Sequence, residues 1–208
     1  MKSIKLMSVV LSVMFILSVN LPAQGGVKGG FNLSKFYSVE PAGMDQKYLA
    51  GFQVGLFKGF NISPSVQIQP EIFYIQKGSK VTMMIDTVEA IAKIRISYFE
   101  IPLLFKFNLK PDTAVNPYLI AGPYVAFRSK ATLTVEAMGQ SEKEDIKEDV
   151  KSTDFGIIGG GGVEFKMGDM LKCILVEIRY ELGLVNIDKG ASSKAKNSSI
   201  VFNVGVGI

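Results

Sequence analysis

Histidine is absent from all 208 residues of the chain. Its absence excludes imidazole general bases, Ser-His and Cys-His nucleophile pairs, and histidine-ligated metal sites. The single cysteine, Cys173, excludes an internal disulfide, and its position far from the N-terminus excludes a lipid-attachment cysteine after an export signal. We therefore expect no enzyme activity, no cofactor and no metal, and we expect Cys173 to be a buried or lipid-facing apolar residue.

Net charge is also low, at +4, and two of the contributing lysines, Lys2 and Lys5, lie in a segment that we expect to be removed. The chain has no cluster of Lys and Arg, so a nucleic-acid partner is not expected. Hydrophobic residues make up 48% and charged residues 20% of the chain, which excludes disorder by composition. The length suits one domain.

Long apolar runs are scarce. The one near the N-terminus, Met7 to Val19, follows two lysines and precedes Asn20-Leu21-Pro22-Ala23, which is the pattern of a secretory signal peptide. It is shorter than the roughly 20 residues of a membrane-spanning helix, so an N-terminal anchor helix is the weaker alternative. We predict a signal peptide over 1–23, cut near Ala23, and a single domain over 24–208.

The rest of the chain alternates with a period of two residues, which is a strand signal because successive side chains point to opposite faces. The segment from Cys173 to Gly183 shows it most clearly, with one apolar face and one face of charge and glycine. The apolar face carries Ile174, Val176, Ile178, Tyr180 and Leu182, and the other carries Leu175, Glu177, Arg179, Glu181 and Gly183.

Eight such segments predict an all-β meander of antiparallel strands. Pro70, Pro102 and Pro123 fall inside them and count against the prediction, because proline removes a ladder donor. The predicted strands cover about 26–36, 48–61, 66–79, 95–108, 117–129, 153–166, 173–184 and 199–208.

The connections alternate in length, as they do in outer-membrane barrels, which have short periplasmic turns and long outer loops. This predicts an eight-stranded antiparallel up-and-down transmembrane β-barrel with both termini in the periplasm. The charged segment Ser141 to Lys151 is either a solvated loop tip, which we favour, or a contact for a divalent cation or lipopolysaccharide. The long connections are 37–47, 80–94, 130–152 and 185–198, and the short ones are 62–65, 109–116 and 167–172.

Two barrels share this period: a soluble ligand-binding barrel with an apolar interior, and an outer-membrane barrel with a polar interior. The polar face carries both signs of charge, as expected of a narrow lumen in which buried charges must pair. Aromatic residues near strand ends would form an interfacial girdle. We assign Glu71, Glu100, Lys106, Glu164, Glu177, Arg179 and Glu181 to a structural lumen network, and Phe60, Tyr74, Phe107, Tyr118 and Tyr180 to the girdle.

The glycine run Gly159 to Gly162 could form a phosphate-binding loop, but such a loop requires a helix after it and usually a Lys-Ser/Thr pair. Here Val163-Glu164-Phe165-Lys166 continues as strand. We interpret the glycines as allowing curvature and making room for lumen side chains.

Four motifs are similar to those of the PorT-like outer-membrane β-barrel family of Gram-negative bacteria of the Bacteroidota type. The resemblance covers nearly all of residues 26–208, and it implies an eight-stranded outer-membrane barrel without fixing a function or supplying catalytic residues. The motifs are Gly26-Val27-Lys28-Gly29-Gly30-Phe31-Asn32, Gln69-Pro70-Glu71-Ile72-Phe73-Tyr74, Tyr98-Phe99-Glu100-Ile101-Pro102-Leu103-Leu104 and Pro117-Tyr118-Leu119-Ile120-Ala121-Gly122-Pro123.

Three functions compete at this point. The first is a structural or interaction barrel that acts through its outer loops. The second is a narrow channel or small-ligand binder, and an accessory role in protein secretion is a related alternative from the family resemblance. The third, a membrane-embedded enzyme, is disfavoured by the lack of histidine. Expected partners are outer-membrane lipid and, during biogenesis, the barrel-assembly machinery.

Overall fold

The computed structural model of the chain describes residues 23–40, 46–85, 88–137, 140–168, 171–190 and 194–208. Apart from Ala23, the predicted signal peptide lies outside these residues, so its cleavage stays a prediction. In the described ranges the structure contains no apolar helix of the length that crossing a bilayer requires.

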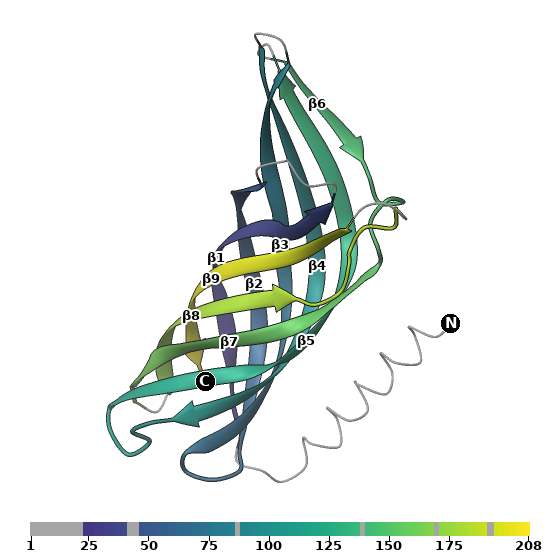
Figure 1. Cartoon of the computed structure of the whole chain (residues 1–208). Coiled ribbons are helices and arrows are strands. Elements are labelled where there is room, and N and C mark those ends of the chain that lie inside the picture. Colours follow the sequence, from purple (N-terminus) through teal and green to yellow (C-terminus); the bar gives the residue numbers. More distant parts are fainter. Residues whose placement is uncertain (1–22, 41–45, 86–87, 138–139, 169–170, 191–193) are drawn as a thin grey trace.

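Nine antiparallel strands make up the described structure, and eight of them close into a ring through the pairing of β4 with β5 (Figure 1). The predicted eight-stranded barrel is thereby confirmed. The ninth strand, β6, pairs only with β5 and lies outside the ring. The strands are β1 (Ala23–Glu40), β2 (Gln46–Asn61), β3 (Val66–Ile85), β4 (Val88–Asn108), β5 (Val115–Ala137), β6 (Gln140–Asp145), β7 (Thr153–Lys166), β8 (Cys173–Gly183) and β9 (Lys194–Gly207).

Two predicted long loops, 80–94 and 130–152, are instead largely strand. β3 and β4 continue as a paired hairpin, and β5 continues to Ala137 and turns back as β6. The residues involved include β-branched Val and Thr that suit strands, but they lie among charges that hide the two-residue alternation. Figure 1 shows both hairpins rising beyond the rest of the barrel.

The prolines within the ring leave the register unchanged on either side. In the pairing of β3 with β4, Pro70 lies opposite Leu103 and Phe73 lies opposite Glu100. A register shift occurs instead in β4–β5 between Ser97 and Tyr98, as a bulge would produce.

The two faces of the barrel differ as the sequence alternation predicts. Along β8 every odd position is buried, whereas Val176, Ile178 and Tyr180 are about half exposed. Outward positions on the other ring strands are also large, apolar and exposed. A polar interior inside an apolar surface is the reverse of a water-soluble protein, so the outer face requires apolar surroundings.

The outward apolar residues form a belt of the height that a membrane needs. On β4 they run from Phe99 to Phe107, which matches the 9–11 residues of a tilted transmembrane strand. Near the upper edge of this belt, Tyr74 lies between Phe52 and Phe99, with ring centroids 5.9 and 5.8 Å away.

The predicted aromatic girdle is partly wrong. Phe107 and Tyr180 are exposed on the outer face, and Tyr74 belongs to the outer aromatic trio. Tyr118 points instead into the lumen, where it donates a hydrogen bond to a carboxylate, and Phe60 is buried. Tyr118 lies at an even, inward position of β5, as the buried Tyr124 does, so strand parity rather than proximity to a strand end sets the side of its ring.

Candidate functional site: the filled lumen and its two mouths

The centre of the lumen holds a four-membered network of opposite charges. The Arg179 guanidinium binds both carboxylate oxygens of Glu71, at 2.6 and 2.8 Å, and its Nε donates to Glu177. The Lys28 ammonium lies 2.7 Å from Glu71 and 3.3 Å from Glu177. All four side chains are buried, and two cations balance two anions, which is the arrangement that buried charge requires.

Neutral donors complete this central network. Gln69 donates to Glu71 at 2.7 Å, and Tyr118 and Asn203 donate to Glu177 at 3.0 and 3.3 Å. Since a carboxylate accepts several hydrogen bonds, these contacts occupy lone pairs that the cations leave free. The central network is therefore held by residues from β1, β3, β5, β8 and β9.

A second buried network lies nearer the long hairpins. Lys77 Nζ is 2.6 Å from Glu100 Oε2 and 2.8 Å from Glu181 Oε2. In the same network, Asp154 accepts hydrogen bonds from Tyr124 at 3.1 Å and from Asn197 at 2.8 Å. These side chains tie β3, β4, β5, β7, β8 and β9 together across the lumen.

The third charged group is the ion pair of Lys106 with Glu164, close to the short-turn mouth. All seven residues assigned to the lumen from the sequence are buried on the inner face and belong to one of these groups. The sequence assignment omitted Lys28, Lys77 and Asp154. Each lies at a polar position of an alternating segment, so strand parity could have identified them.

Glycines create the space that lumen aromatic rings occupy. A Cβ placed on Gly162 would lie 2.6 Å from the Tyr118 hydroxyl, and one on Gly156 would lie 2.5 Å from the Tyr124 ring. Gly159, in contrast, would meet nothing within 4 Å. The run 159–162 lies within strand β7, so it forms no phosphate-binding loop.

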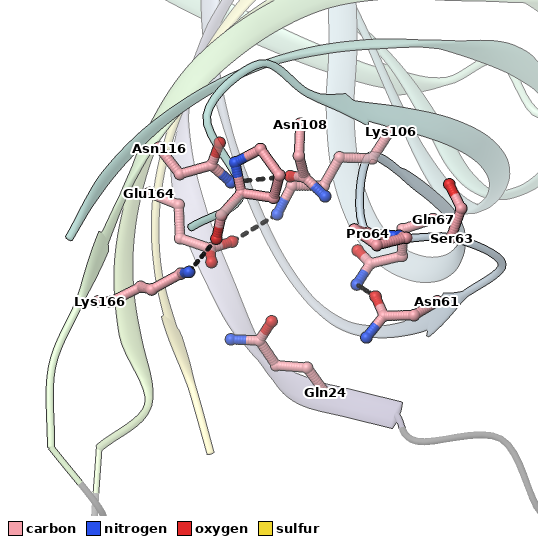
Figure 2. Close-up of a pocket in the computed structure, with 11 residues that line it drawn as sticks. Gln24, Asn61, Ser63, Pro64, Gln67, Lys106, Asn108, Asn116, Glu164 and Lys166 are labelled. Atoms are coloured by element: carbon pink, nitrogen blue, oxygen red, sulfur yellow. Dashed lines mark hydrogen bonds and ion pairs between the residues drawn. The ribbon is translucent and has the colours of Figure 1, made fainter. Parts of the chain in front are cut away.

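A polar pocket of about 370 Å³ opens at the short-turn mouth (Figure 2). Many of its polar groups already bind each other: Asn116 donates to Asn108 at 2.9 Å, Gln67 donates to Asn61 at 3.0 Å, and Lys166 donates to the Pro111 carbonyl. The lining comprises Gln24, Asn61, Ser63, Pro64, Gln67, Lys106, Asn108, Pro111, Asn116, Glu164 and Lys166. No sequence motif indicated this pocket, since its residues come from six strands and two turns.

An apolar cluster extends through the lumen to the end that carries the hairpins. Val150 and Ile187, from the two connections that follow β6 and β8, pack with Phe36 and Ile96 of the barrel wall. The two connections also pair with each other, since Lys151 donates its backbone N–H to the Ile187 carbonyl at 2.7 Å. The charged segment Ser141 to Lys151 is exposed at nearly every position, as the solvated interpretation predicts, and Val150 is its one buried residue.

Among the residues that the structure describes, no three His, Cys, Asp or Glu side chains are grouped as a metal site requires. Cys173 is buried and accepts a hydrogen bond from Gln24. The expected lack of enzyme activity and of a cofactor stays a prediction.

Residues 18–189 match the family described as "outer membrane protein beta-barrel domain". The chain belongs to this family. Membership of the outer membrane protein β-barrel domain family places the apolar belt in a bacterial outer membrane, and it agrees with the closed antiparallel ring.

Solved structures of small outer-membrane barrels are similar to this family member over most of their length. The OprG protein of Pseudomonas aeruginosa shares 12% identity at a TM-score of 0.48, covering 91% of this chain and 97% of its own. Neisserial surface protein A shares 15% at 0.47, covering 89% and 98%. The attachment invasion locus protein Ail of Yersinia pestis shares 12% at 0.45, covering 90% and 100%. None of the curated proteins compared with the chain matches it.

Proposed function

We propose that this barrel is a closed interaction module that acts through the end carrying the long hairpins. The observation that carries the proposal is the filled lumen. Arg179, Glu71 and Glu177 have no exposed side-chain surface, and buried apolar residues such as Phe36 and Val150 lie beyond them toward the hairpins. An eight-stranded ring leaves an interior just wide enough for side chains, so transport through it is disfavoured.

The hairpins supply the surface for such a role. On β4, residues 88–98 extend beyond the apolar belt, which at 3.3 Å per residue corresponds to about 35 Å along the strand. β6 pairs on one side only, and all six of its residues are exposed. An exposed strand edge can pair with an extended segment of another protein.

The orientation of the barrel is part of the proposal. Long connections outside and short turns inside are the rule for outer-membrane barrels. The first and last ring strands pair with each other, and Ile208 donates its backbone N–H to the Gly25 carbonyl at the short-turn end. Both ends of the mature barrel would then lie on the periplasmic side.

A small-ligand binder or narrow channel is the second candidate, and the 370 Å³ pocket favours it. The pocket is lined by amides and lysines that suit a small polar molecule. The PorT-like resemblance adds an accessory role in protein secretion as a third candidate, in which a partner would reach the barrel from the periplasm.

Planar-bilayer recordings separate the closed module from the channel. We expect the folded protein to insert without discrete unitary currents, because buried ion pairs and apolar side chains fill the part of the lumen that the structure describes. Insertion is verified by recovering the protein from the bilayer in its folded form. The folded barrel is heat-modifiable, which means that unboiled and boiled samples migrate differently on a detergent gel. Reproducible single-channel steps from verified insertions would contradict the closed lumen and favour the channel.

Cysteine labelling tests the orientation. Lys143→Cys on β6 and Asp112→Cys in a short turn are both at exposed positions. On intact cells, a membrane-impermeant maleimide should label the Lys143→Cys variant and miss the Asp112→Cys variant. The unaltered chain is the control, because its buried Cys173 should not react. Labelling with the opposite preference would mean that the barrel is inverted.

A further inference from the structure

Basic side chains follow the apolar belt on the outer face, at the end that carries the hairpins. Strand register places them there: Lys80 lies opposite Lys93, and Lys130 lies opposite Ser97, two residues beyond Phe99 of the belt. We call the set the basic band, and its members are Lys35, Lys80, Lys93, Arg95, Lys130 and Lys196.

The band surrounds much of the barrel. Its members come from β1, β3, β4, β5 and β9. These strands lie on both sides of the β4–β5 pairing that closes the ring. Lys35 and Lys196 lie over the rings of Tyr48 and Tyr37, at 4.9 and 5.9 Å from the centroids. Aromatic rings beside basic residues are typical of a membrane–water interface.

Among the side chains that the structure describes, few carboxylates lie against this band. Only Lys93 of the six forms an ion pair with another described residue, Glu136, at 2.6 Å. Arg95 donates to neutral acceptors, the Gln76 amide oxygen and the Ala50 carbonyl. The lumen differs in this respect, because Lys28 and Arg179 of the central network both have a carboxylate partner.

At the opposite end the exposed lysines lie mostly in the turns, as Lys110 and Lys172 do. Among the outward strand positions that the structure describes at the short-turn end, Lys58 is the one basic residue, and its ammonium lies over Phe60. Basic residues on the outer face of the strands are therefore concentrated at the hairpin end, so the charge of this face differs between the two ends of the barrel.

We propose that the basic band binds the phosphate groups of anionic lipid headgroups in the leaflet from which the hairpins emerge. This inference rests on the proposed membrane orientation of the hairpins. Four of its residues, Lys80, Lys93, Arg95 and Lys130, lie at the level of β4 positions two to six residues beyond Phe99, which is about 5–14 Å of height for strands tilted by about 45°. Headgroups occupy that zone, and long basic side chains can reach down into it.

The arrangement favours lipid over a dissolved anion. A single soluble ligand would contact one side of the barrel, whereas lipids surround it, as the band does. The pockets at the short-turn mouth contain none of the band residues, and the band residues point outward from different strands. Phosphate carried by many lipids can engage all of them at once, and Lys and Arg both bind phosphate.

The experiment measures which lipids border the barrel. The full chain is reconstituted in vesicles of phosphatidylcholine with a minor fraction of phosphatidylglycerol, and spin-labelled versions of each lipid report the motionally restricted shell. We expect about a threefold preference for phosphatidylglycerol. It should fall toward one in 1 M NaCl, where the screening length is about 3 Å.

The test variant carries Lys80→Gln, Arg95→Gln and Lys130→Gln, and the control carries Lys58→Gln, Lys110→Gln and Lys172→Gln, with the same loss of charge. The preference for phosphatidylglycerol should disappear in the test variant and persist in the control. Heat-modifiable migration on a detergent gel verifies that both variants are folded. An equal preference in both variants would overturn the proposal. So would its abolition by millimolar inorganic phosphate, which would identify a dissolved anion as the partner. Loss of the preference would leave the closed-lumen result intact, because conductance does not depend on the band.

Discussion

Arg179→Met should lower the free energy of unfolding by about 3–5 kcal/mol, the usual cost of removing one partner from a buried ion pair. Arg179 binds Glu71 through two nitrogen atoms and also donates to Glu177. Without it, two buried carboxylates would share Lys28 alone, so one negative charge would lack a partner. Urea titration of the folded barrel in lipid vesicles, followed by heat-modifiable migration, gives the free energy.

Two controls decide whether charge pairing is the cause. Lys93→Gln breaks an ion pair whose side chains are 32% and 39% exposed, and such a surface pair should contribute less than about 1 kcal/mol. Combining Arg179→Met with Glu71→Gln removes one charge of each sign and should recover part of the lost stability. A loss for Arg179→Met no larger than that for Lys93→Gln would show that the lumen is hydrated rather than sealed.

Much of the barrel could be predicted from the sequence because lipid and lumen impose opposite chemistry on alternate residues. In β8 this alternation is nearly complete, so both the strand and its faces were identified correctly. The seven lumen residues followed from the same rule, since a charge at an inward position of a narrow ring has to be buried.

The hairpins escaped prediction because they leave the membrane. Beyond the belt both faces of a strand can be polar, and the signal that distinguishes strand from loop fades. β6, with the sequence Gln-Ser-Glu-Lys-Glu-Asp, is exposed at every position and carries no alternation at all. It forms because β5 offers an edge for pairing, which is a tertiary cause that local sequence does not encode.

The contents of the lumen were only partly predictable for a different reason. Which charge pairs with which depends on register across the ring: Glu71 and Arg179 are 108 positions apart in the chain yet in contact. The pairing of glycine with aromatic rings is equally non-local, because Tyr118 fits only where Gly162 stands opposite on β7. Whether a residue is polar, and which face of its strand it occupies, can be read from the local sequence. Which residue it contacts across the lumen depends on how the ring closes.

Val176→Arg should destabilise the barrel in lipid by about 2–4 kcal/mol, the cost of a basic residue on the lipid-facing side near the bilayer midplane. Val176 is 49% exposed on the outer face. Its cross-strand neighbours on that face, Val163 and Val204, are also apolar, so the guanidinium would find neither an anion nor a hydrogen-bond acceptor among them. The same urea titration in vesicles measures the loss.

The matched controls vary one property at a time. Val176→Leu keeps the position apolar and should change the free energy of unfolding little, while Ser141→Arg adds the same charge on exposed β6, beyond the belt, and should be equally mild. In detergent, whose headgroups lie closer to the barrel wall, the penalty for Val176→Arg should shrink. If Val176→Arg were as mild as Ser141→Arg in lipid, the wall around β8 would not be in contact with hydrocarbon. The outward apolar belt would then have to be covered by another protein, since water could not surround it.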